Sequence, residues 1–117
     1  MIDIGKVGEQ LVVDDLVLNG WMIIDRNFHT RYGELDIVAL KDGRLRFVEV
    51  KRRSSQSWLW DAVPASKVRR MVRSAEVFIS ASNVQHSELE LSTAIVVCNE
   101  IEWINNCVDM EETWLYT

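Results

Sequence analysis

Two acidic side chains and a lysine are spaced along neighbouring strand-like segments in a way that suits phosphodiester cleavage. Asp36 lies in one segment, and Glu49 and Lys51 lie in the next. Two carboxylates, a backbone carbonyl such as that of Val50, and waters form the hard oxygen site that Mg²⁺ prefers. A metal ion there, Mg²⁺ or Mn²⁺, acidifies a water and offsets the phosphate charge, while a lysine orients the water. The spacing therefore makes Asp36, Glu49 and Val50 candidate metal ligands and Lys51 a candidate catalytic residue.

A hairpin over these two segments is what would bring the side chains together. Asp42-Gly43 stands between two alternating apolar runs, which is a strong signal for a two-residue hairpin turn. With that turn, Asp36 faces Glu49 across the strands on one face of the sheet, with Cβ atoms about 4.5–5.5 Å apart. Like charges at this distance repel each other unless a cation neutralises them.

The same register places Glu34 opposite Lys51, and this leaves a second interpretation open. In that interpretation Glu34 and Lys51 form a surface ion pair, and Asp36 and Glu49 are solvated acids at the ends of their strands. Isolated patterns of this kind are common by accident. Spacing alone does not decide between a metal site and a solvated end of the hairpin.

Helices and further strands must position the hairpin. The apolar spacing predicts one helix over residues 6–18, ended by Asn19-Gly20, and a second that begins near Pro64. Residues 26–31 are predicted as a polar connection. Strands are predicted over 21–24, 34–40, 44–50, 93–98 and 101–104. The order αβββαββ indicates an α/β protein with a mixed central sheet, organised as one domain over residues 1–117.

Four strings in the sequence carry a family resemblance. They are GKVGE (5–9), N-x-x-T-R-x-GELDIVA (27–39), FVEVKRR (47–53) and A-V-x-x-x-K-x-R-R (62–70). Together they resemble the YraN-like (UPF) family of small, largely uncharacterised bacterial proteins. That family is similar to the PD-(D/E)XK, restriction-endonuclease-like nucleases and to archaeal Holliday-junction resolvases. The resemblance implies a restriction-endonuclease-like fold and a Mg²⁺-dependent endonuclease.

The resemblance also implies roles for individual residues. Asp36 and Glu49 match the two metal-binding acids of the motif, and Lys51 matches its lysine. Glu9 matches a glutamate on the first helix that approaches the metal in related nucleases, although an exposed helix glutamate is an equal alternative. Glu34 belongs to the matching string and could support Lys51.

Charge is distributed unevenly along the chain. The formal net charge of −5 argues by itself against a nucleic-acid partner. Residues 26–73, however, contain twelve basic and five acidic residues, whereas residues 74–117 contain eight acidic residues and neither Lys nor Arg. A solvated helix face is the alternative to a surface that contacts phosphates. The side chains predicted to bind nucleic acid, most of all DNA, are Lys67, Arg70, Arg69, Arg73, Arg52, Arg53 and Arg31.

Composition excludes several classes of protein. Hydrophobic residues make up 48% and charged residues 26% of the chain, which is typical of a globular protein rather than a disordered or fibrous one. The sequence predicts no secretory signal, and its apolar runs are shorter than the roughly 20 residues of a membrane span. Cys98 and Cys107 are expected to be reduced thiols of a cytoplasmic protein, with Cys98 buried.

Aromatic residues leave further alternatives open. Trp58 and Trp60 alternate in a polar loop, where they could stack on bases or cover the edge of the core. An apolar patch that pairs with a second copy, giving a homodimer, could be formed by Trp103, Trp114, Leu115 and Tyr116. Besides a nuclease, two functions remain open: a non-catalytic nucleic-acid-binding or repair-accessory module, and a protein–protein adaptor that uses the C-terminal part.

Overall fold

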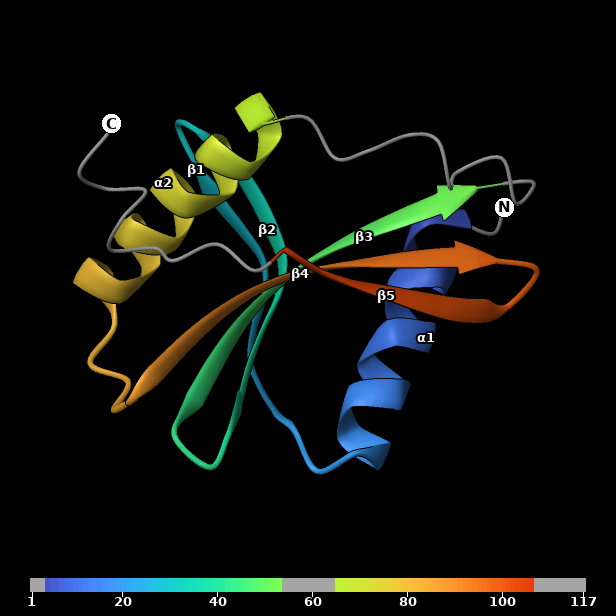
Figure 1. The fold of residues 1–117 in the computed structure, drawn as a ribbon, viewed down its shortest axis with the longest axis horizontal. Coiled ribbons are helices and arrows are strands. Elements are labelled where there is room, and N and C mark those ends of the chain that lie inside the picture. The colour runs from blue at the N-terminus through green and yellow to red at the C-terminus, as the bar shows by residue number, and fades with distance from the viewer. Residues whose placement is uncertain (1–3, 54–64, 107–117) are drawn as a thin grey trace.

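The computed structural model describes residues 4–53 and 65–106 (Figure 1). Within these ranges the elements follow the predicted order αβββαββ. The two helices are α1 (Ile4–Leu18) and α2 (Ala65–Ala81). The strands are β1 (Met22–Thr30), β2 (Gly33–Lys41), β3 (Arg44–Arg53), β4 (Glu88–Val97) and β5 (Glu100–Asn106). No helix in the described ranges combines the length and the hydropathy that a bilayer span requires.

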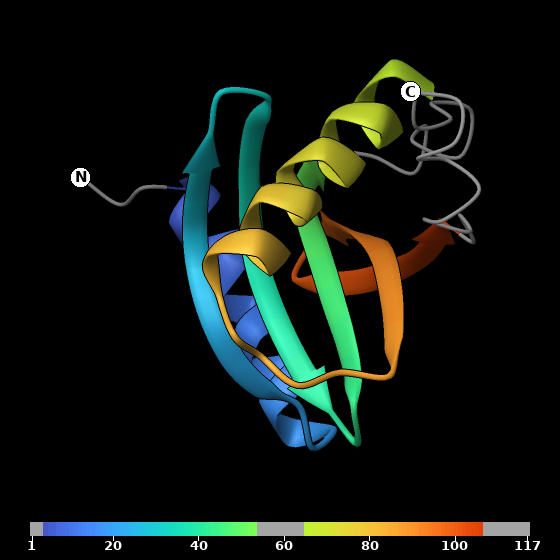
Figure 2. The same ribbon diagram turned by 90° about the vertical axis from the view of Figure 1, so that its left-hand side faces the viewer.

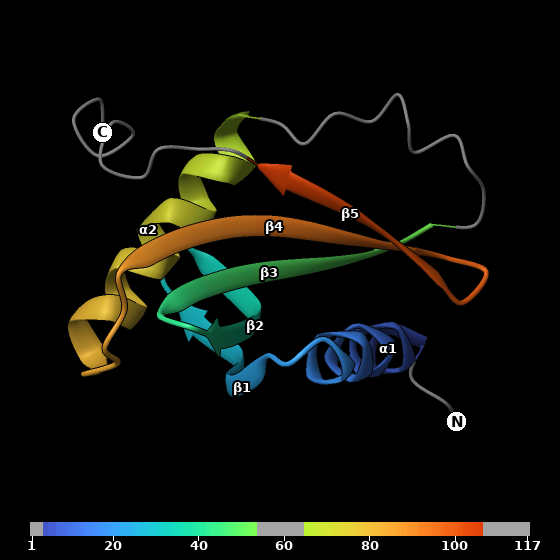
Figure 3. The ribbon, with the colours of Figure 1, turned by 60° about the horizontal axis from the view of Figure 1, so that its bottom comes forward.

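The strands form one mixed sheet in the order β1-β2-β3-β4-β5. β3 and β4 are parallel, and every other neighbouring pair is antiparallel. The parallel pair requires a crossover connection, and the chain passes through α2 between these strands. Figures 2 and 3 show the two helices on opposite faces of the sheet. The result is the restriction-endonuclease-like α/β arrangement that the sequence predicted.

Helix α1 packs on one face of the sheet and ends in a defined cap. Its buried Val12 and Leu16 belong to a core cluster that also contains Trp21. Gly20 has a φ of 89°, and its N–H donates to the Val17 carbonyl, while the Trp21 N–H donates to the Leu16 carbonyl. This is the Schellman pattern of helix ends. The Asn19-Gly20 stop predicted from the sequence is therefore confirmed.

Helix α2 packs on the opposite face, over the β2–β3 hairpin. Its buried side chains include Met71, Val72 and Phe78, which share a core cluster with the inward-facing side chains of the hairpin. The Phe78 ring meets those of Phe28 and Phe47 edge to face, with centroids 5.3 and 5.9 Å away. Such pairs stabilise a core beyond the area that they bury. The hairpin and α2 are thereby held in one fixed relation.

The predicted hairpin turn is confirmed. Asp42 and Gly43 have φ values of 50° and 78°, as a type I′ turn requires. The pairing of β2 with β3 begins at Lys41 opposite Arg44, in the predicted register, and continues as far as Ile37 opposite Val48.

Strands β1 and β4 are longer than predicted. Residues 26–30, predicted as part of a polar connection, belong to β1, which pairs with β2. β1 is an edge strand, so its polar side chains can face water while its backbone is bonded on one side. β4 begins at Glu88 instead of residue 93, because Glu88 pairs with Arg44 of β3, and Arg44 also forms an ion pair with Glu90.

The prediction that Cys98 is buried is wrong, because its thiol is exposed. Cys98 and Asn99 form the turn between β4 and β5, with φ values of 48° and 64°. β4 ends at Val97, one residue before the predicted end of the strand at Cys98. Several residues singled out in the sequence lie outside the described ranges: Trp58, Trp60, Cys107, Trp114, Leu115 and Tyr116.

Candidate functional site

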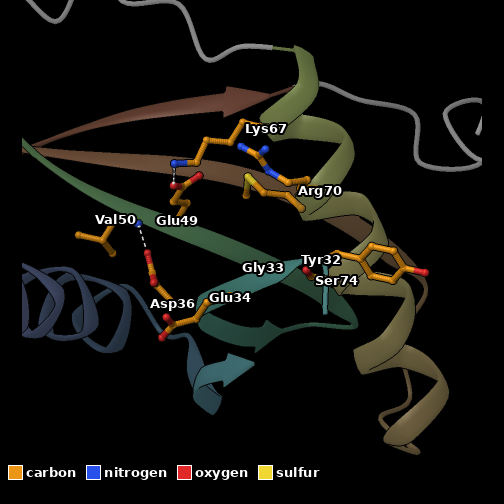
Figure 4. Close-up of a pocket in the computed structure, with 10 residues that line it drawn as sticks. Tyr32, Gly33, Glu34, Asp36, Glu49, Val50, Lys67, Arg70 and Ser74 are labelled. Carbon is orange, nitrogen blue, oxygen red and sulfur yellow. Dashed lines mark hydrogen bonds and ion pairs between the residues drawn. The ribbon is translucent and has the colours of Figure 1, made fainter. Parts of the chain in front are cut away.

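A pocket of about 410 Å³ lies where the open end of the β2–β3 hairpin faces α2 (Figure 4). Of the residues predicted to act in a site, Asp36, Glu49, Val50, Lys67 and Arg70 all line this pocket. Strands β2 and β3 supply the acids, and the first half of α2 supplies the basic side chains. Residues that are far apart in the sequence therefore meet at one place.

Asp36 stands where the ladder between β2 and β3 stops. The last pair of the ladder is Ile37 opposite Val48. Beyond it, the Val50 N–H donates a hydrogen bond to the side chain of Asp36, at 2.7 Å from Oδ2 (Figure 4). Side chains two residues apart on a regular strand point to the same face of the sheet. Leu35 and Ile37 instead belong to core clusters on opposite faces, so the alternation of side chains along β2 is interrupted at Asp36. The predicted convergence of Asp36 and Glu49 is therefore achieved at a break in the pairing, not inside a regular ladder.

The surroundings of the Asp36 carboxyl group disfavour its ionised form. Burial raises its pKa to about 6, and the Val50 N–H bond opposes this rise. The negative charges of Glu49, Glu34 and Glu9 raise the pKa of Asp36 further. A cation near Asp36 would act in the opposite direction and favour its ionised form.

Glu49 is the second acid of the pocket, and only one of its oxygens is paired. Oε1 forms an ion pair with Lys67 Nζ (Figure 4). Oε2 is buried and, among the described residues, has no hydrogen-bond partner. A buried carboxylate oxygen without a partner is unfavourable, and a cation or a bound water would satisfy it.

The acids of the pocket fit a divalent cation that keeps several waters. No group of three or more His, Cys, Asp or Glu side chains in residues 4–53 and 65–106 is arranged to hold a metal. Asp36 and Glu49, the two acids predicted as ligands, would supply the carboxylate oxygens, and a backbone carbonyl and waters would complete the shell. Mg²⁺ is commonly held in this way, by one or two carboxylates and several waters.

Two lysines lie next to each other beside Glu49. Burial lowers the pKa of Lys51, and a hydrogen bond with Lys67 and the charge of Lys67 lower it further. Burial also opposes the charge of Lys67, but its hydrogen bonds to Glu49 and Lys51 outweigh this and raise its pKa. Of the two lysines, Lys51 therefore loses its proton more readily than Lys67 does.

Glu9 is buried, with 8% of its surface exposed, so the alternative of an exposed helix glutamate is wrong. Its Oε1 accepts hydrogen bonds from Arg26 Nε and Nη2, at 3.2 and 3.1 Å, and from Asn27 Nδ2 at 3.1 Å. Glu9 does not line the pocket, although its charge contributes to the raised pKa of Asp36. Glu9 therefore links α1 to β1 through its hydrogen bonds to Arg26 and Asn27.

The predicted basic side chains fall into separate groups. Lys67 and Arg70 line the pocket. Arg31 and Arg73 flank the ring of Tyr32. Arg52 and Arg53 lie at the end of β3, and Arg69 is exposed on α2.

Tyr32 and Ser74 also line the pocket, and neither was predicted as a site residue. Tyr32 occupies an unspecified position, marked x, in the string N-x-x-T-R-x-GELDIVA, so the family resemblance gave no signal for it. Ser74 lies on the face of α2 that borders the pocket.

Trp103, predicted as part of an apolar patch, makes its contacts within the chain. The Arg46 guanidinium lies 4.1 Å from the centroid of the Trp103 ring. Trp103 Nε1 donates to Asp15 Oδ2 at 3.1 Å.

A mixed five-stranded sheet lies between two helices, with Asp36 of β2 and Glu49 of β3 at one pocket. Lys51 of β3 does not line this pocket but interacts with Lys67 and Glu49, which do. This α/β arrangement is that of a restriction-endonuclease-like protein. The chain belongs to the family described as "Uncharacterised protein family UPF0102", whose profile matches residues 8–103. This is the family to which the YraN-like resemblance pointed.

The chain is similar to relatives that are each named UPF0102 protein. The relative from Persephonella marina is 29% identical over 109 residues, which cover 92% of this chain and 94% of the relative. The relative from Synechococcus sp. (strain JA-3-3Ab) is 41% identical over 90 residues, covering 74% of this chain and 66% of the relative. The relative from Fusobacterium nucleatum is 29% identical over 108 residues, covering 91% of each chain.

Proposed function

We propose that this protein is a Mg²⁺- or Mn²⁺-dependent nuclease that hydrolyses phosphodiester bonds in DNA or another structured nucleic acid. One observation carries the proposal. The carboxylates of Asp36 and Glu49 line one pocket with Lys67 and Arg70, and a buried Glu49 oxygen lacks a hydrogen-bond partner among the described residues. Acids that attract a cation and basic groups that attract a phosphate thus share one cavity.

Each side chain has a chemical part in this proposal. A bound divalent cation supplies an acidified water and offsets charge on the phosphate. Asp36 and Glu49 hold the cation. Lys51, whose pKa is lowered by burial and by Lys67, accepts a proton from the attacking water at Nζ. Arg70, exposed on α2 at the mouth of the pocket, contacts phosphate oxygens.

The test is cleavage of labelled duplex, single-stranded and branched DNA and of RNA in Mg²⁺ or Mn²⁺. We expect Asp36→Ala and Lys51→Ala each to lower the cleavage rate by about 100-fold or more, as is usual when a positioned acid–base group is lost. Lys41→Ala is the matched control, because Lys41 Nζ donates to the Asn19 carbonyl at the other end of the hairpin. Cleavage that survives both Asp36→Ala and Lys51→Ala would place the activity elsewhere.

A non-catalytic nucleic-acid-binding or repair-accessory module is the second candidate function. It is favoured by the ion pair of Lys67 with Glu49, because the ammonium group of Lys67 already neutralises one of the two acids that would bind the metal. Binding without cleavage under every metal condition would support it. In both cases Arg70→Glu should weaken binding and reduce its salt dependence. An adaptor is less favoured, because the Trp103 side chain is engaged within the chain.

A cytoplasmic location and a homodimer belong to the same proposal. The exposed Cys98 thiol suits a reducing compartment. Cutting both strands of a duplex with one site per chain would require two copies. Light scattering of the protein alone and with duplex DNA measures whether a second copy is recruited.

A further inference from the structure

The turn between β1 and β2 presents Tyr32 in a rigid setting. The Tyr32 N–H donates to Thr30 Oγ1 at 3.0 Å, and Thr30 Oγ1 in turn donates to the Gly33 carbonyl at 2.9 Å. Thr30 Oγ1 also forms a 2.9 Å hydrogen bond with Ser74 Oγ of α2, and Ser74 is only 1% exposed. The turn is thereby tied to the helix, and the position of the Tyr32 backbone is set before any ligand binds.

Two arginines lie close to the half-buried ring of Tyr32. The Arg31 guanidinium carbon lies 4.9 Å from the ring centroid, and Arg31 Nη2 donates to the Tyr32 hydroxyl at 2.6 Å. The Arg73 guanidinium carbon lies 5.8 Å from the same centroid. Aromatic rings and guanidinium planes are both surfaces on which nucleic-acid bases stack. Positive charge at the same place attracts the phosphate backbone.

Tyr32 lines two cavities. It lines the pocket of Asp36 and Glu49, and it lines a second pocket of about 670 Å³ with Arg31, Val77 and Ala81. A cavity of this size is within the range that holds small organic ligands.

A single face of α2 runs past both pockets. Successive side chains three or four residues apart share one face of a helix, and Lys67, Arg70, Ser74, Val77 and Ala81 have that spacing. The first three line the pocket of Asp36 and Glu49, and the last two line the second pocket. At 1.5 Å per residue this face is about 21 Å long.

We propose that Tyr32, with Arg31 and Arg73, forms a stacking subsite for an unpaired nucleotide, so that the substrate is a nucleic acid with a single-stranded segment beside the cleaved bond. A base can lie on the Tyr32 ring or on a neighbouring guanidinium only when it is out of the duplex stack. Val77 and Ala81 supply apolar contact for the base or sugar. The position beside the cleaved bond rests on the proposed function, whereas the binding of an unpaired base does not.

The experiment measures binding separately from cleavage. Fluorescence anisotropy in EDTA gives dissociation constants for a labelled oligothymidylate and for a blunt duplex hairpin of equal charge. We expect Tyr32→Ala to weaken single-strand binding by about 5- to 150-fold, the effect of losing one stacked base, and to change duplex binding by less than about 2-fold. Tyr32→Phe keeps the ring and should bind the single strand within about 2-fold of the natural protein.

Controls separate stacking from loss of the fold. Circular dichroism melting checks that each variant is folded, and Tyr32→Trp keeps an aromatic surface if Tyr32→Ala does not fold. His86→Ala changes an exposed side chain away from both pockets and should leave both dissociation constants unchanged. Equal weakening on both probes, or no weakening in Tyr32→Ala, would overturn the subsite. If Tyr32→Ala does not fold, Tyr32→Trp binding that prefers the single strand no more than the duplex would overturn it too.

The outcomes distinguish this inference from the proposed nuclease activity. If the protein cleaves no substrate but binds single strands through Tyr32, the nuclease proposal fails and the subsite stands. If it cleaves duplexes while Tyr32→Ala binds both probes as the natural protein does, the nuclease proposal stands and the subsite fails.

Discussion

Replacing Asp36 by Asn should stabilise the metal-free protein at alkaline pH. Burial, opposed by the Val50 N–H bond and aided by neighbouring acids, raises the Asp36 pKa from 3.8 to about 6. At about 1.4 kcal/mol for each pKa unit, this disfavours the ionised form in the folded state by about 3 kcal/mol. Solvent screening of a partly exposed group reduces the figure to about 2 kcal/mol. Asn removes the charge and can still accept the Val50 N–H bond.

The sign of the pH dependence follows from the raised pKa. The folded protein holds the Asp36 proton more tightly than the unfolded chain does, so the penalty is fully present above a pH of about 6. It declines as the pH falls from about 6 to 3.8 and is absent below that. Asp36→Asn should therefore raise the free energy of unfolding by about 2 kcal/mol at pH 8, and by less than about 0.5 kcal/mol at pH 4.

Urea unfolding in EDTA at the two pH values measures this difference. Asp14→Asn is the matched control, because Asp14 is exposed on α1, and its effect should stay within about 0.5 kcal/mol. Equal stabilisation by Asp36→Asn at both pH values would show that packing, not charge, is responsible. Destabilisation at pH 8 would refute the raised pKa. Mg²⁺ should raise the stability of the natural protein and have less effect on Asp36→Asn.

Three further substitutions test the groups around the pocket. Lys67→Met removes the ammonium group that pairs with Glu49 Oε1, so the melting temperature in EDTA should fall, and added Mg²⁺ should restore part of the loss. Glu9→Gln weakens the charged hydrogen bonds from Arg26 and should lower the free energy of unfolding by about 1–2 kcal/mol in urea titrations. Gly33→Ala should destabilise the protein by about 1–2 kcal/mol in the same assay, because φ is 144° at Gly33 although the space for a methyl group is open. A higher melting temperature for Lys67→Met in EDTA, or no change for either of the other two, would contradict the corresponding contact.

The ion pair of Lys67 with Glu49 links the two halves of the proposed site. Lys67 carries the positive charge that is paired with Glu49, and a divalent cation would compete for the same carboxylate. A phosphate bound near Arg70 offers Lys67 another anionic partner. This is the physical reason to expect Mg²⁺ and nucleic acid to strengthen each other's binding, a coupling that must be reciprocal.

Local chemistry in the sequence was sufficient to predict the hairpin. Asp42-Gly43 can adopt the two positive φ angles of its turn, and that turn sets the register from Lys41 opposite Arg44 onward. The register in turn predicted that Asp36 and Glu49 meet. Cys98 shows the limit of this reasoning, because an apolar run does not reveal at which residue the chain turns.

The order of the elements and the hairpin turn could be predicted from the sequence, because turn chemistry and alternation act between near neighbours. The register also brought Asp36 and Glu49 to the same end of the hairpin, but the break in pairing at Asp36 was not predictable from alternation. The side chains that pair with the acidic residues became known only from the folded structure. Lys67 of α2 forms an ion pair with Glu49, and Arg26 of β1 forms one with Glu9 of α1. These contacts depend on how α2 and α1 pack on opposite faces of the sheet. Burial, which raises the pKa of Asp36, likewise exists only after that packing is complete.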